Sequence, residues 1–130
     1  MPARIAANTV LTLTQKMEAL APPDMQSGDK QALLTFANTL DRMVMVKEQH
    51  AELCKRELLI LWTDYFKPPH LERWPDLHTK VWNACKLASK CKQEVNLQAS
   101  QDLMAAVNEI ADIFYQSGYA MPNPQLMQAR

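Results

Sequence analysis

The sequence predicts an all-α protein, an elongated antiparallel helical bundle of about three long helices followed by an extended C-terminal tail. Only two of the 130 residues are glycine, and residues of high helix propensity dominate the composition. Apolar residues recur every three or four positions along most of the chain, which is the periodicity of an amphipathic helix. With 48% hydrophobic residues, the chain has the size and apolar content of a single domain spanning residues 1–130.

The first helix is expected over residues 3–21. Its apolar positions return at helical spacing and comprise Ala6, Val10, Leu13, Met17 and Leu20. The pair Pro22-Pro23 ends this helix. Ser27 or Asp29 can cap the next helix by accepting a hydrogen bond from a free backbone N–H.

The second helix, residues 31–66, is the longest and organises the rest of the chain. Its stripe consists of Leu33, Ala37, Leu40, Val44, Lys47, Ala51, Cys54, Leu58, Leu61 and Tyr65. Only Lys47 interrupts the apolar or small character of this series. At 1.5 Å per residue the helix is roughly 50 Å long, so other helices must cover its stripe. It stops at Lys67-Pro68-Pro69, because proline disfavours helical backbone at the residue before it.

A third helix is expected over residues 75–117, paired antiparallel with the second. Three successive steps of four, from Cys91 to Leu103, form a stutter that either rotates the stripe or breaks the helix near residues 96–100. Trp62, Trp74 and Trp82 are expected to pin the hairpin as core residues. Gly118 suits the residue after the helix end, and residues 118–130 are expected to form an extended, flexible tail.

The composition excludes several classes of function. Fourteen basic and fourteen acidic residues cancel, so no net field attracts nucleic acid or an anionic membrane. No stretch has the length of a membrane span or of a signal-peptide core. The three cysteines lie on predicted helices and are odd in number, which favours free thiols in a reducing cytoplasm. We therefore expect a cytoplasmic monomer or homodimer with no nucleic-acid partner and no membrane insertion.

The candidate metal-binding and catalytic residues do not form a recognisable site. His50 and Cys54 lie one turn apart, but a metal site needs further ligands that the sequence does not show. Cys85 and Cys91 are separated by about 240° around a helix, so they cannot clamp one ion. No catalytic residue, metal or cofactor is predicted, and a metal-dependent enzyme is the least favoured alternative.

The C-terminal part of the third helix carries a broad apolar face. Its members are Leu103, Met104, Val107, Ile110, Ala111, Phe114 and Tyr119. This face either packs against the other helices as core or binds a partner helix, and the sequence leaves both interpretations open.

Three stretches resemble the FlgN family of flagellar type III export chaperones. They are LLTFANTLDRMVMVKEQHAELCKREL, the Trp74-started segment WPDLHTKVWNACKLASKCKQEVNLQ, and the run QDLMAAVNEIADIFYQSGYAMP. The resemblance implies a cytoplasmic chaperone without enzymatic activity or cofactor. Its C-terminal helix would bind amphipathic terminal helices of secreted or flagellar substrates, keep them from premature self-association, and pass them to the export apparatus. The alternative is a helical inhibitor or immunity protein that blocks an enzyme stoichiometrically.

Overall fold

Residues 1–118 are described by a computed structural model, and all regular secondary structure in this range is helical. The elements are α1 (Pro2–Ala19), α2 (Lys30–Ile60), the π-helix η1 (Leu61–Tyr65), α3 (Pro68–Arg73), α4 (Leu77–Gln93) and α5 (Leu97–Gln116). The predicted all-α class is confirmed for the described residues. None of their helices combines the length and hydropathy needed to cross a membrane.

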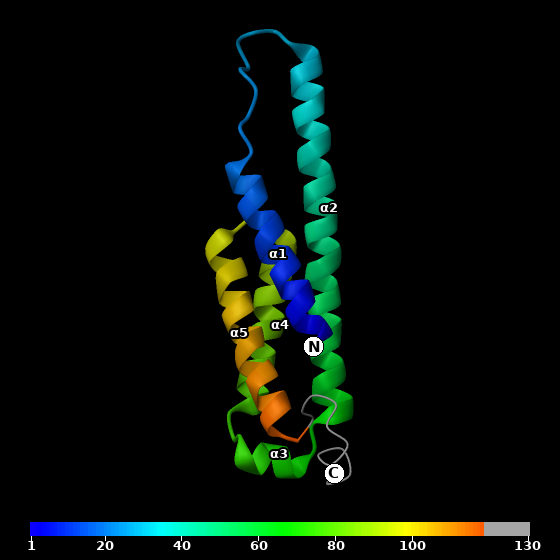
Figure 1. The fold of residues 1–130 in the computed structure, drawn as a ribbon, viewed down its shortest axis with the longest axis vertical. Helices are drawn as coiled ribbons and strands as arrows, with labels where there is room; N and C mark the ends of the chain where they lie inside the picture. Colours follow the sequence, from blue (N-terminus) through cyan, green and yellow to red (C-terminus); the bar gives the residue numbers. More distant parts are fainter. Residues whose placement is uncertain (119–130) are drawn as a thin grey trace.

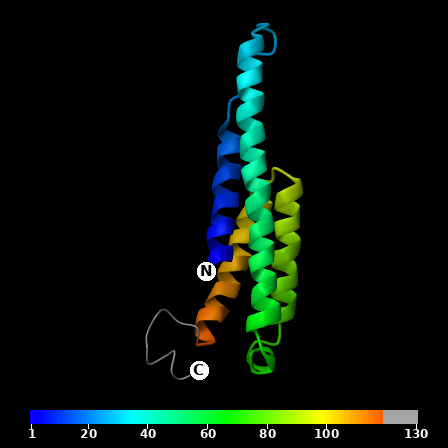
Figure 2. The same ribbon diagram turned by 90° about the vertical axis from the view of Figure 1, so that its right-hand side faces the viewer.

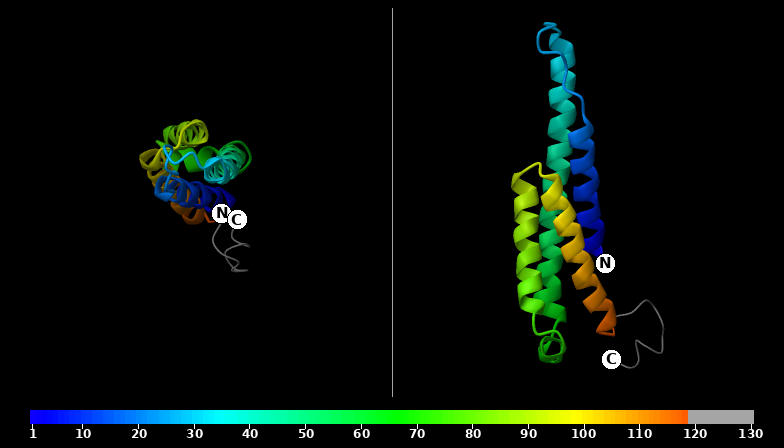
Figure 3. Two further views of the ribbon diagram at one scale, coloured as in Figure 1. Left: turned by 90° about the horizontal axis from the view of Figure 1, so that it is seen from above. Right: turned by 90° about the vertical axis from the view of Figure 1, so that its left-hand side faces the viewer.

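The four long helices form a bundle around one core. α2 runs the full length of the molecule, and α1 packs along it in the opposite direction (Figure 1). α3 crosses the lower end, from which α4 ascends beside α2 and α5 descends beside α4 (Figures 1 and 3). α1 contacts α2 and α5, and α4 contacts the same two helices, so each long helix has two neighbours.

The expected third helix is two antiparallel helices, so the bundle has four long helices instead of about three. α4 ends at Gln93, and Glu94 has an extended backbone with φ −130° and ψ 153°. The Asn96 side chain then accepts a hydrogen bond from the Ala99 N–H at 2.9 Å and caps α5. The stutter between Cys91 and Leu103 therefore marks a chain reversal rather than a rotation of the stripe.

Only the lower half of α2 is buried as its stripe predicts. Leu33 and Ala37 are exposed, and Leu40 and Val44 are half-buried. Full burial begins at Lys47. The physical reason is the division of the third helix, because the shorter α4 and α5 reach only about halfway up α2 (Figures 1 and 2).

The lower end differs from the expected aromatic core. Trp62 and Trp74 are half-buried against the core, but Trp82 is 54% exposed and does not pin the hairpin. The short helix α3 lies between the end of the second expected helix and the start of the third. At the other end of the described chain, Gly118 has φ +106°, a conformation that favours glycine after a helix. Tyr119 and the rest of the expected tail lie outside the described residues.

Candidate functional site

The three cysteines lie in the hydrophobic core of the bundle. Cys54 on α2 and Cys91 on α4 are almost fully buried, and Cys85 on α4 is 8% exposed. All three are free thiols. Burial raises the pKa of Cys54 to about 12, with a smaller contribution from the neighbouring thiols, and raises the pKa of Cys91 to about 11. Burial also raises the pKa of Cys85. Because the thiolate is the nucleophile and the metal ligand, the raised pKa values disfavour both roles for these thiols at neutral pH.

The raised pKa values predict a loss of stability at alkaline pH. A group whose folded-state pKa is raised contributes stability below its unfolded pKa, here 9.0, and loses it as pH rises toward the folded value. We expect the free energy of unfolding to fall above pH 9 by about 1.4 kcal/mol per pH unit for each of Cys54 and Cys91. Urea titrations at pH 8 to 10.5 measure this slope. The double variant Cys54→Ala/Cys91→Ala is the control, and an equal slope in both proteins would contradict the assignment.

His50 does not join Cys54 in a site. The His50 Nδ1 lies 2.8 Å from the Val46 carbonyl oxygen, so the ring donates to its own helix one turn back. Cys54 is buried in the core while His50 is only half-buried. Within residues 1–118, no three His, Cys, Asp or Glu side chains come together in a way that would hold a metal ion.

Aromatic contacts join η1 to α3 and to the end of α5. The Tyr65 ring stacks on His70, with centroids 5.4 Å apart, and meets Phe114 edge-on at 4.9 Å. The Tyr65 hydroxyl hydrogen-bonds to the Ser117 Oγ. The Lys67 N–H donates to the His70 Nδ1 at 2.9 Å, so this nitrogen is occupied as an acceptor. The cluster stabilises the corner around α3 and holds no convergent set of reactive groups.

A small cavity of about 310 Å³ lies between the start of α1, the end of α2 and the end of α5. Its lining residues are Met1, Pro2, Ala3, Glu57, Ile60, Leu61, Phe114 and Tyr115. The walls are mainly apolar, and the lining residues with polar groups include Met1 at its N-terminus, Glu57 with its carboxylate and Tyr115 with its hydroxyl. The Met1 nitrogen donates to that hydroxyl at 3.3 Å. A cavity of this kind suits a small ligand, but a single carboxylate is too few ligands for a metal ion.

The C-terminal apolar face is directed toward the inside of the bundle. Leu103, Val107, Ile110 and Ala111 are fully buried, and Phe114 is 7% exposed. Met104 is half-buried against the same core, and Tyr119 lies outside the described residues. The face is therefore packed intramolecularly over the described part of α5.

Comparison with known proteins identifies the family. The sequence model of the family described as nickel-containing superoxide dismutase matches residues 1–118. The chain belongs to this family. The superoxide dismutase [Ni] of Streptomyces seoulensis is 36% identical over 115 residues, which cover 88% of this chain and 77% of the relative. Its counterpart in Streptomyces coelicolor is 33% identical over the same shares of both chains.

Solved structures of nickel superoxide dismutase have the same fold as this chain. A native structure at 1.30 Å has a TM-score of 0.73 at 33% identity, covering 89% of this chain and 88% of the other. An apo structure has the same score and identity, covering 88% and 91%.

These findings correct the functional interpretation drawn from the sequence. The chain is not a FlgN-like export chaperone, because the family that matches nearly its whole length is an enzyme family. The prediction of a protein without enzymatic activity is wrong for the same reason, and so is the alternative of a helical inhibitor. The expected partners, secreted or flagellar substrate helices and the export apparatus, have no support.

The described residues do not fit the nickel that the family name implies. Nickel in proteins is held by several donor groups, and soft thiolates or imidazoles are common among them. The three thiols here are buried, which raises their pKa values, and no three His, Cys, Asp or Glu side chains in residues 1–118 come together to hold a metal ion. Residues 119–130 contain no His, Cys, Asp or Glu.

Sequence reasoning missed the family because the described residues carry no signature of its chemistry. The one pair with metal-ligand spacing, His50 and Cys54, is not a site in the structure. The segment from Leu61 to His70 departs most from an ordinary helix end, with a π-helix, two prolines and a short helix in succession. π-Helical turns are frequent at functional sites, but their presence is difficult to read from a sequence.

Proposed function

We propose that this protein takes part in superoxide disproportionation, with the helical bundle serving as the scaffold of the enzyme. The observation that carries the proposal is the match of the nickel-containing superoxide dismutase family over residues 1–118. Relatives of 36% and 33% identity that bear this name support it. The substrate is the superoxide anion, and the products are dioxygen and hydrogen peroxide.

The proposal assigns no ligand role to the cysteines of the bundle. A thiol must lose its proton to bind a metal, and the pKa of Cys54 is raised to about 12. Cys85 and Cys91 also have raised pKa values through burial. The proposal therefore places no nickel on these thiols. The free thiols are compatible with the reducing cytoplasm expected from the sequence.

The test uses the protein isolated from its native host. Nickel content is measured by elemental analysis, and superoxide disproportionation is measured by its competition with a superoxide-reduced dye. We expect the wild-type protein to disproportionate superoxide. We also expect the variant Cys54→Ala/Cys85→Ala/Cys91→Ala to keep its nickel-to-protein ratio and its activity per folded molecule.

Different results would contradict the proposed activity and the absence of a ligand role for the cysteines. Wild-type protein without superoxide-disproportionating activity would overturn the proposed function. A folded triple variant that has lost nickel would instead show that thiols of the bundle bind the metal. Alanine is chosen because a serine hydroxyl buried at these positions would lack a hydrogen-bond partner. Circular dichroism verifies that the variant is folded, and single variants replace the triple variant if it is not.

A further inference from the structure

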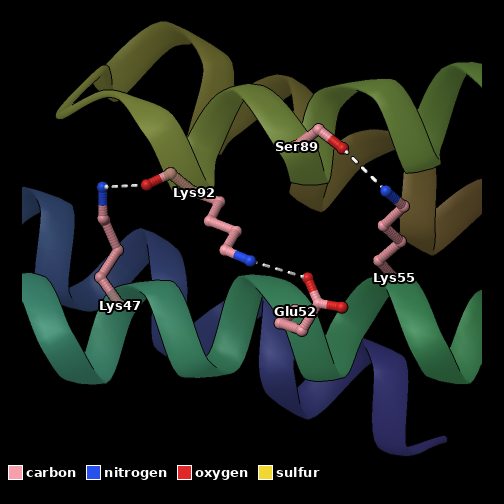
Figure 4. A network of polar contacts seen from close by, with 5 residues as sticks. All are labelled: Lys47, Glu52, Lys55, Ser89 and Lys92. Carbon is pink, nitrogen blue, oxygen red and sulfur yellow. Dashed lines mark hydrogen bonds and ion pairs between the residues drawn. The ribbon is translucent and has the colours of Figure 1, made fainter.

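Lys47 is a fully buried lysine in the middle of α2. Its side chain is 1% exposed, although it occupies a position of the apolar stripe. Its Nζ donates to the carbonyl oxygen of Lys92 at 3.2 Å and to that of Glu94 at 2.8 Å. Figure 4 shows Lys47 extending from α2 to the end of α4. Among the described residues, no carboxylate forms an ion pair with it. Burying an ammonium group is unfavourable unless it donates hydrogen bonds. The hydrogen bonds to these two carbonyls are therefore the main compensation for its lost hydration.

The end of α4 lacks local hydrogen-bond donors for its last carbonyl groups, and Lys47 supplies them. The last carbonyls of a helix have no partner within the helix, and many helices satisfy them with a glycine in the left-handed conformation. α4 has no such residue, since Glu94 follows Gln93 in an extended conformation. The Lys47 ammonium, supplied from a distant part of the chain, therefore replaces a local cap. Its positive charge also lies at the negative end of the α4 dipole.

The other polar contacts between α2 and α4 are of a different kind. Lys92 pairs with Glu52 at 3.2 Å, but both side chains are more than 40% exposed. Lys55 donates to the Ser89 hydroxyl at 3.2 Å in a half-buried position. Exposed ion pairs contribute little to stability. Figure 4 shows these contacts further along the same interface. Lys47 is the buried connection, and it lies where α4 reverses into α5.

We infer that Lys47 is a latch that holds the α4–α5 turn, residues 94–96, closed against α2 and so controls local opening of the bundle at this end. The turn carries Asn96, whose side chain caps α5. Loss of the latch would free the end of α4 and the start of α5 together, because both depend on the position of this turn. Local opening of this type is a property of small cooperative units within a folded protein.

Native-state hydrogen exchange of the full chain tests the latch. We expect Lys47→Met to accelerate exchange of the backbone amides of residues 94–100 at least tenfold relative to wild type. Methionine retains much of the apolar stem but donates no hydrogen bond, so two carbonyls lose their partner. The matched control is Lys55→Met, which removes another α2-to-α4 hydrogen bond and should leave those amides within twofold of wild type. Amides in the middle of α1 are the internal reference.

A second measurement does not depend on a variant that folds. In the wild-type protein, the Lys47 ammonium protons should exchange with water slowly enough to give a resolved nitrogen-correlated NMR signal, whereas exposed lysines do not. Equal acceleration in Lys47→Met and Lys55→Met would overturn the inference. So would acceleration spread evenly over α1 and the turn, or a Lys47 ammonium that exchanges as fast as an exposed one.

Discussion

Replacing Val107 by Asp is expected to abolish stable folding of the bundle. Val107 is fully buried in the middle of α5. A carboxylate there would lose its hydration without gaining a partner, and such changes cost about 4 kcal/mol or more. Most small domains have a free energy of unfolding of about 5–15 kcal/mol, so the variant is expected to be largely unfolded at physiological temperature or to melt far below wild type. Thermal melting followed by circular dichroism measures the effect.

Ala105→Asp is the matched control, because Ala105 lies on the same helix but is exposed. It introduces the same carboxylate two residues away and should shift the melting temperature only slightly. The alternative interpretation of this apolar face as a binding surface predicts that Val107→Asp also melts close to wild type. Similar melting of the two variants would therefore place Val107 outside the core.

Replacing Leu58 by Ala is expected to destabilise the protein by about 2–5 kcal/mol. Leu58 is fully buried in the lower half of α2, where α1 and α4 both pack against this helix. Removing its branched end leaves a cavity that rigid neighbouring helices can only partly fill. Urea unfolding measures the change in the free energy of unfolding.

Leu59→Ala is the control for this change, because the neighbouring Leu59 side chain is 43% exposed. The same atoms are removed, but little packing is lost, so the expected destabilisation is below about 1 kcal/mol. The assignment of the buried face of α2 fails if Leu59→Ala is the more damaging of the two substitutions.

The candidate site is the part that the sequence predicted least well. His50 and Cys54 have the sequence spacing of a possible metal-binding pair. In the structure Cys54 is buried in the core, whereas the half-buried His50 ring donates a hydrogen bond to the Val46 carbonyl oxygen. Pattern resemblance pointed to a chaperone because amphipathic helices look alike in unrelated helical proteins, whereas identity along nearly the whole chain distinguishes one family from another. No cluster of potential metal ligands is present in residues 1–118 to point to the family's chemistry.

The fold class was determined by local properties. Helix propensity, apolar periodicity and the prolines at residues 22, 23, 68 and 69 act within a few residues, so the sequence alone predicts helices in these places. The cap of α2 is of the same kind, since Asp29 accepts from the Ala32 N–H three residues later.

Tertiary structure decided what those helices bury. The stutter after Cys91 allowed a rotation or a break, and only packing of α5 back against α1 and α4 selects the reversal. Because of that reversal, the short helices α4 and α5 cover only part of α2. Leu33 is therefore exposed, although Leu33 belongs to the apolar stripe. Lys47 is the opposite case, a charge in an apolar series that is buried because the carbonyls of Lys92 and Glu94 arrive beside it. A sequence specifies which side chains share a face by local geometry. Whether that face meets another helix, water or a hydrogen-bond acceptor depends on residues far away in the chain.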